Sequence, residues 1–85
     1  GVAAPSRERP RSKRLGYLEQ REWDGMERAI LDAEAALEAC GQATEDPGIA
    51  SDPAALQACY AALEAARATV DRLYARWAEL EAKKA

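Results

Sequence analysis

The sequence predicts an all-α fold: an antiparallel two-helix coiled-coil hairpin preceded by a flexible basic N-terminal segment. Two tracks of apolar residues at heptad spacing, a stretch rich in proline and glycine between them, and a composition poor in strand formers lead to this prediction. The chain has 85 residues, no Phe and only 6% aromatic residues, whereas strands favour aromatic and β-branched side chains. A chain of this length forms one domain at most.

Each track advances by alternate steps of three and four residues, which places its side chains along one seam of a supercoiled helix. The first track consists of Trp23, Met26, Ile30, Ala33, Leu37 and Cys40. The second consists of Leu56, Cys59, Leu63, Ala66, Val70, Leu73, Trp77 and Leu80. Antiparallel pairing of the tracks predicts the layers Trp23–Trp77, Met26–Leu73, Ile30–Val70, Ala33–Ala66, Leu37–Leu63 and Cys40–Cys59.

The stretch 44–53 holds two prolines and a glycine and cannot continue a helix. We therefore expect helices at about 17–41 and 53–82, joined by this loop, within a hairpin domain at 15–85. Residues 1–14 hold two prolines and five basic residues and are predicted to be a flexible basic linker. The chain begins with Gly rather than Met, and we expect it to be a domain of a longer protein.

Specific residues are expected to delimit the helices. Gly16 is an acceptable N-cap of the first helix, with Glu19 at the N3 position of a capping box, and Gly41 is the expected C′ residue that ends this helix. Asp52 is the expected N-cap of the second helix, and Pro53 suits its first position because no N–H is needed there.

Charge is segregated along the chain although the net charge is only −3. Residues 29–66, which we call the loop end, contain seven acidic residues and no Lys or Arg. All twelve basic residues lie in residues 1–28 and 67–85, which a hairpin brings together and which we call the open end. A cluster of cations of this kind is typical of contact with phosphate backbones.

Three stretches of the sequence are distinctive: residues 15–22 (LGYLEQRE), 51–53 (SDP) and 73–81 (LYARWAELE). They resemble, in this order, the opening LSYKEQRE, the turn and the close LYERWEELE of the C-terminal domain of Uup-type ABC-F ATPases. The matches are in order and cover residues 15–81. Gly16 stands where the family has a capping Ser, and Leu18 stands where it has a Lys, which removes one basic residue from the expected contact face.

The resemblance implies a parent protein with two ABC ATPase domains that bind ATP and Mg, a linker, and this hairpin at the C-terminus. It also implies a cytoplasmic protein without a membrane partner, and a hairpin that binds DNA, branched DNA included. Other ABC-F proteins act on the ribosome, so ribosomal RNA is a competing partner. The chief alternative to nucleic-acid binding is a protein-interaction module that docks on its own ATPase domains or self-associates, and engagement of the ribosome is the third.

Candidate nucleic-acid-binding residues follow from the charge pattern and from two tyrosines off the seam that could stack on unpaired bases. They are Arg7, Arg9, Arg11, Lys13, Arg14, Arg21, Arg28, Arg72, Arg76, Lys83, Lys84, Tyr17 and Tyr74. The alternative without a binding function is that the cations form an ordinary solvated surface. For Trp23 and Trp77, it is that both side chains pack in the core.

No catalytic or metal-binding pattern is found, and we expect this chain not to be an enzyme and to hold no cofactor of its own. It lacks His, a glycine-rich phosphate loop and Cys-x-x-Cys spacing. Cys40 and Cys59 are expected in one core layer, either as reduced buried thiols or as a disulfide if their Cα atoms come within about 7 Å.

Overall fold

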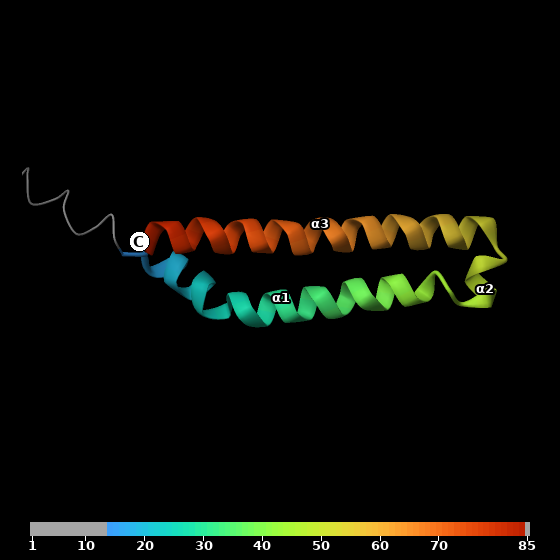
Figure 1. Cartoon of the computed structure of the whole chain (residues 1–85), viewed down its shortest axis with the longest axis horizontal. Helices are drawn as coiled ribbons and strands as arrows, with labels where there is room; N and C mark the ends of the chain where they lie inside the picture. The colour runs from blue at the N-terminus through green and yellow to red at the C-terminus, as the bar shows by residue number, and fades with distance from the viewer. Residues whose placement is uncertain (1–13, 85) are drawn as a thin grey trace, which may run out of the picture.

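The computed structural model describes residues 14–84, all of whose regular structure is helical. Helix α1 covers Tyr17–Ala43, the short α2 covers Pro47–Ala50, and α3 covers Pro53–Lys84. Helices α1 and α3 lie side by side and run antiparallel, with α2 in the connection between them (Figure 1). The prediction of an all-α fold is confirmed, and the expected flexibility of residues 1–13 concerns a stretch outside the described residues.

The first long helix starts where the sequence predicts and ends later. The backbone N–H of Gly16 donates to Glu19 Oε1 at 3.2 Å, which is the half of a capping box that a glycine without a side chain can form. The prediction that Gly41 ends the helix is wrong, because α1 continues to Ala43. The Thr44 hydroxyl donates to the Gly41 carbonyl at 2.7 Å and satisfies it without a left-handed glycine.

The connection contains a helical turn that the sequence analysis missed. Asp46 caps α2 by accepting a hydrogen bond from the Gly48 N–H at 2.7 Å, and Pro47 occupies the first helical position. The same Asp-Pro pattern opens α3, where Asp52 Oδ1 accepts from the N–H groups of Ala54 and Ala55 at 3.1 and 3.3 Å. The predicted start of the second helix is confirmed, and its end lies two residues beyond the expected position.

The core is concentrated at the open end. Met26, Ile30 and Leu80 form a buried cluster, against which half-buried side chains pack: Leu15, Trp23, Leu73 and Trp77. Val70 is also buried opposite Ile30, whereas the seam residues farther along the loop end, from Ala33 to Ala66, are only half-buried. Two helices enclose one layer of side chains, so only the bulky layers at the open end exclude water fully.

Two predicted layers can be checked by direct contacts, one at each end of the seam. The ring centroids of Trp23 and Trp77 are 6.1 Å apart and the rings are tilted by 58°. At the other end, Cys59 Sγ lies 3.9 Å from the Cys40 carbonyl oxygen. Both contacts agree with the predicted register. That the pair supercoils as a coiled coil stays a prediction.

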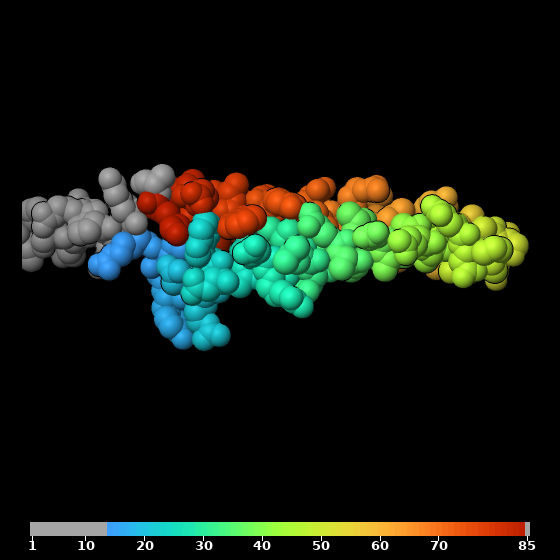
Figure 2. All heavy atoms as spheres, turned by 60° about the horizontal axis from the view of Figure 1, so that its bottom comes forward, coloured from blue at the N-terminus to red at the C-terminus, as the bar shows by residue number. Residues whose placement is uncertain are grey.

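The aromatic layer makes the open end broad. In the space-filling view, the start of α1 projects sideways from the rod beside the end of α3, whereas the loop end is slim (Figure 2). The open end therefore contains the buried cluster and, in this view, is also the broader end of the described molecule.

Leu80 and Leu31 form a matched pair for testing where stability resides. Leu80 is fully buried and Leu31 is 54% exposed. Leu80→Ala should lower the free energy of unfolding by about 2–5 kcal/mol, because it leaves a cavity at the centre of the cluster. Leu31→Ala should change it by less than about 0.5 kcal/mol. Urea denaturation followed by circular dichroism measures both, and equal losses would contradict the burial of Leu80 in the core.

Candidate nucleic-acid interface

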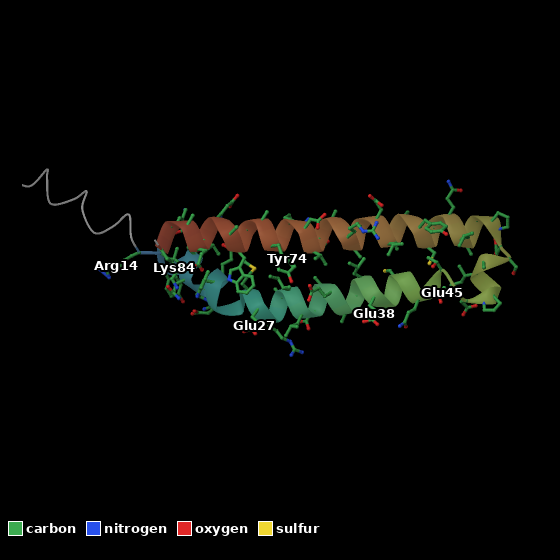
Figure 3. All side chains as sticks on the ribbon, viewed as in Figure 1. Arg14, Glu27, Glu38, Glu45, Tyr74 and Lys84 are labelled. Atoms are coloured by element: carbon green, nitrogen blue, oxygen red, sulfur yellow. The ribbon has the colours of Figure 1, made fainter. Side chains whose placement is uncertain are left out.

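The described candidate residues all come from the open end. Arg14, Tyr17, Arg21 and Arg28 lie before or on α1, and Arg72, Tyr74, Arg76, Lys83 and Lys84 lie on α3. Figure 3 labels Arg14 and Lys84 next to each other at this end and Glu45 at the far end. Arg7, Arg9, Arg11 and Lys13 lie outside the described residues. The fold thus brings together nine residues from two distant parts of the chain.

Arg76 is held between carboxylates from both long helices. Its Nε and Nη2 donate to the two oxygens of Glu22 on α1 at 2.8 and 3.0 Å, and its Nη1 donates to Glu79 on α3 at 2.8 Å. These hydrogen bonds, Glu22 foremost, raise the pKa of Arg76 and lower the pKa of Glu22 below its ordinary value of 4.5. A guanidinium with all three nitrogens engaged is less available to phosphate than a free one.

A second ion pair joins the helices nearer the start of α1 and the end of α3. Lys83 donates to Glu19 Oε2, while Glu19 Oε1 accepts from Gly16. The hydrogen bond from Lys83 and then that from Gly16 lower the pKa of Glu19 below 4.5. We call Arg76, Glu22, Glu79, Lys83 and Glu19 the interhelix clamp.

The remaining cations of the open end differ in how far they are engaged. Lys84 Nζ lies 4.0 Å from the centroid of the Trp23 ring, in a cation–π contact. Arg21 donates to the Tyr17 hydroxyl at 3.2 Å, and Arg28 pairs with Asp32 at 3.2 Å. Arg72 is exposed and forms no ion pair with any residue of 14–84.

The helical part of the open end is electrically balanced. In residues 15–28 and 67–84 the seven basic residues are Arg21, Arg28, Arg67, Arg72, Arg76, Lys83 and Lys84, and the seven acidic residues are Glu19, Glu22, Asp24, Glu27, Asp71, Glu79 and Glu81. The surplus of cations therefore comes from residues 1–14, whose five basic residues are offset only by Glu8.

The sequence analysis did not identify the acidic residues of the clamp, Glu19, Glu22 and Glu79. It located the basic residues of the two helices but did not ask which carboxylates lie opposite them. The signal was present in the register. Glu22 and Arg76 directly precede Trp23 and Trp77 of one predicted layer, so they lie on the same side of the seam. Charged residues that flank the seam in this way commonly pair between helices.

Tyr74 lies in acidic surroundings. It is 45% exposed, and its hydroxyl donates to Glu34 Oε2 on α1 at 2.7 Å, which raises the pKa of Tyr74. With Trp77, Ala78 and Glu81 it lines a shallow groove on α3. Tyr17 is 73% exposed at the start of α1, where Arg21 lies over its ring. Of the two tyrosines, Tyr17 has the surroundings better suited to a nucleic acid.

Comparison with known proteins gives the family. The model of the ABC transporter C-terminal domain matches residues 14–82, most of the chain. The chain belongs to this family, and so is a C-terminal domain of an ABC-type ATPase. No curated protein and no solved structure matches it. Among residues 14–84, no helix is long and apolar enough to cross a membrane.

The interhelix clamp predicts a loss of stability in acid. The pKa values of Glu19 and Glu22 lie below 4.5 in the folded chain, so the stabilisation is present above pH 4.5 and is lost as pH falls through the lowered values. We expect the melting temperature to fall between about pH 5 and pH 3. Glu19→Gln/Glu22→Gln should melt lower than the parent at pH 7, and the two should converge in acid. Curves that coincide at pH 7 would mean that the clamp adds nothing, and a constant offset down to pH 3 would mean that the loss does not come from ionised carboxylates.

The cysteine layer predicts an intramolecular disulfide under oxidation. Both thiols are free and half-buried, and Cys59 Sγ contacts the backbone of Cys40. With a mild oxidant such as oxidised glutathione, we expect Cys40 and Cys59 to join within one chain, so that non-reducing gels show a faster monomer. Mainly dimeric product would show that the register at the loop end is not maintained in solution. Cys40→Ala, which leaves one thiol, is the control.

Proposed function

We propose that this domain is the nucleic-acid-binding module of a cytoplasmic, Uup-type ABC-F ATPase, with DNA as its partner. In the parent protein, ATP and Mg would bind to the ATPase domains and not to this hairpin. Contact with DNA would be made by residues Arg7–Arg14 together with the exposed side chains of the open end, Arg21, Arg72 and Lys84 among them. The two long helices would act as a coiled-coil support that sets the distance between this contact and the acidic loop end.

The observation that carries the proposal is the distribution of charge along the rod. The loop end has seven acidic residues and no Lys or Arg, the helical part of the open end is balanced, and residues 1–14 have four more basic than acidic residues. Helix α3 has 32 residues and is about 48 Å long, several Debye lengths at physiological salt. A phosphate backbone at the open end is therefore screened from the acidic residues at the tip of the loop end, Glu45, Asp46 and Asp52.

The clamp narrows the set of residues assigned to this contact. Breaking the bidentate Arg76–Glu22 pair would leave a carboxylate facing DNA, which opposes binding. Arg76 and Lys83 are therefore assigned to holding the helices together. Tyr74 is left out of the proposed contact because Glu34 and Glu81 lie near it. Affinity would come from counterion release and show little sequence preference.

A protein-docking function is the second candidate, and the groove lined by Tyr74 and Trp77 favours it. An aromatic surface next to paired charges is typical of protein interfaces. In this alternative the hairpin would bind its own ATPase domains. Its cations would orient the hairpin on those domains and would not bind phosphate. Ribosomal RNA would contact the same cations as DNA. A binding assay that compares the two nucleic acids distinguishes these partners.

The test is fluorescence anisotropy with labelled duplex DNA, a four-way DNA junction and a ribosomal RNA fragment. Replacing Arg7, Arg9, Arg11, Lys13 and Arg14 by Gln should weaken DNA binding about 100-fold at low salt, because about five counterions are no longer released. In the parent chain, Arg72→Glu should weaken binding further than Arg72→Gln, since it adds repulsion.

The matched control is Arg28→Gln/Arg67→Gln, which removes two cations that already pair with Asp32 and Glu64. We expect it to change DNA affinity less than about threefold. If the chain without its five N-terminal cations bound DNA and RNA as tightly as the parent, the proposal would be wrong and docking on a protein would be the better explanation. Preferential binding of RNA at every salt concentration would favour the ribosome instead.

A further inference from the structure

The groove on α3 combines an aromatic surface with negative charge. The centroids of the Tyr74 and Trp77 rings are 6.4 Å apart, and with Ala78 they line a groove that also includes Glu81. Tyr74 is fixed by its hydrogen bond to Glu34 and so is held in position at the edge of the groove. The groove is therefore a formed feature of the folded hairpin.

Glu81 lines the groove and Glu34 is hydrogen-bonded to its Tyr74. Of the cations in the same part of α3, Lys84 follows Glu81 by three residues and lies over the Trp23 ring, and the others lie mostly on the other side of the helix. Asp71 precedes Tyr74 by three residues and Glu81 follows it by seven, which places both on the Tyr74 side of the helix. Arg72, Arg76 and Lys83 share a different side, where Arg76 and Lys83 meet Glu22 and Glu19 of α1. Arg67, two turns before Tyr74, already pairs with Glu64.

This arrangement suits a cationic side chain and repels phosphate. Aromatic faces attract Lys and Arg, and a neighbouring carboxylate adds a charge-assisted hydrogen bond. The hairpin already contains one such contact, in which the Lys84 ammonium lies over the Trp23 ring. Trp77 offers an equivalent ring that borders the groove and is only half-buried.

We propose that the groove binds the chain's own basic segment, residues 7–13, with an Arg side chain stacked on Tyr74 and Trp77 and paired with Glu81. The segment has four basic residues and one acidic residue, the reverse of the charge around the groove. It continues directly from Arg14, and Leu15 packs against the cluster that contains Leu80, so the segment starts at the correct end of α3.

The tether is long enough for this contact. The groove residue Ala78 precedes Lys84 by six residues, about 9 Å along the helix, whereas seven extended residues span about 23 Å. A short tether also gives the segment a local concentration of the order of millimolar, so weak individual contacts are sufficient.

With docking of this kind, the groove and DNA would compete for the same basic segment. The cations proposed to bind DNA would rest on the groove until phosphates displace them, and the hairpin would thus restrain its own nucleic-acid binding. The inference goes beyond the proposed function and is tested without nucleic acid. Its failure would leave DNA binding untouched, and a failure of DNA binding would leave the docking intact.

The test compares ¹H–¹⁵N NMR spectra of the full chain with those of an Arg7→Gln/Arg9→Gln/Arg11→Gln/Lys13→Gln variant at low salt. Within residues 14–84, we expect the largest shift differences at the Trp77 indole N–H and at the amides of Ala78 and Glu81. The differences should be independent of protein concentration. They should collapse in 1 M salt, where the Debye length is about 3 Å.

The same comparison in two further variants of the chain locates the site at which the basic segment binds. With Glu81→Gln, the shift differences caused by the four neutralisations should shrink by at least half. Glu79→Gln removes the same charge from the opposite side of α3 and should leave them unchanged. Differences confined to the residues next to Arg14, or equal on both sides of α3, would overturn the proposal. Differences that grow with protein concentration would overturn it too, by assigning the groove to a second copy of the chain.

Discussion

The buried cluster of Met26, Ile30 and Leu80 is the contact on which the rest of the structure depends. A pair of helices has no second layer to cover its seam, so burial is complete only where large side chains widen it. Trp23, Trp77 and Leu15 provide that width at the open end. The start of α1 and the end of α3 are consequently held together, and cations of one helix come within reach of carboxylates and aromatic rings of the other.

Electrostatics then divides the open end into parts with different roles. On one side of α3 the interhelix clamp uses cations to join the helices, and on the other side carboxylates surround an aromatic groove. Neither side has a large surplus of positive charge. The surplus of basic over acidic residues lies in residues 1–14 of the sequence, and in the proposed function the helical part of the open end would support them. In the proposed function, the acidic loop end would repel phosphates from the far half of the rod.

Much of this fold could be predicted from local signals, because the helices begin at residues with strong terminal preferences. Asp52-Pro53 sets the start of α3, and the same reasoning applied to Asp46-Pro47 would have revealed α2. The prediction that Gly41 ends α1 was wrong because glycine is tolerated inside a helix. Here the Thr44 hydroxyl donates to the Gly41 carbonyl, so no left-handed glycine is needed to end the helix. The clamp was implicit in the register, but the Tyr74–Glu34 and Lys84–Trp23 contacts depend on side-chain rotamers that spacing does not determine.

The most direct measurement of the central claim, that phosphate contact by the N-terminal cations gives the domain its function, is the salt dependence of DNA affinity for the full chain. Each neutralised phosphate contributes about −0.9 to the slope of log K against log salt concentration. Five cations in residues 1–14 predict a slope of about −4 to −5. A slope near zero, with binding that persists at high salt, would contradict the claim and indicate that the hairpin recognises its partner through apolar contact.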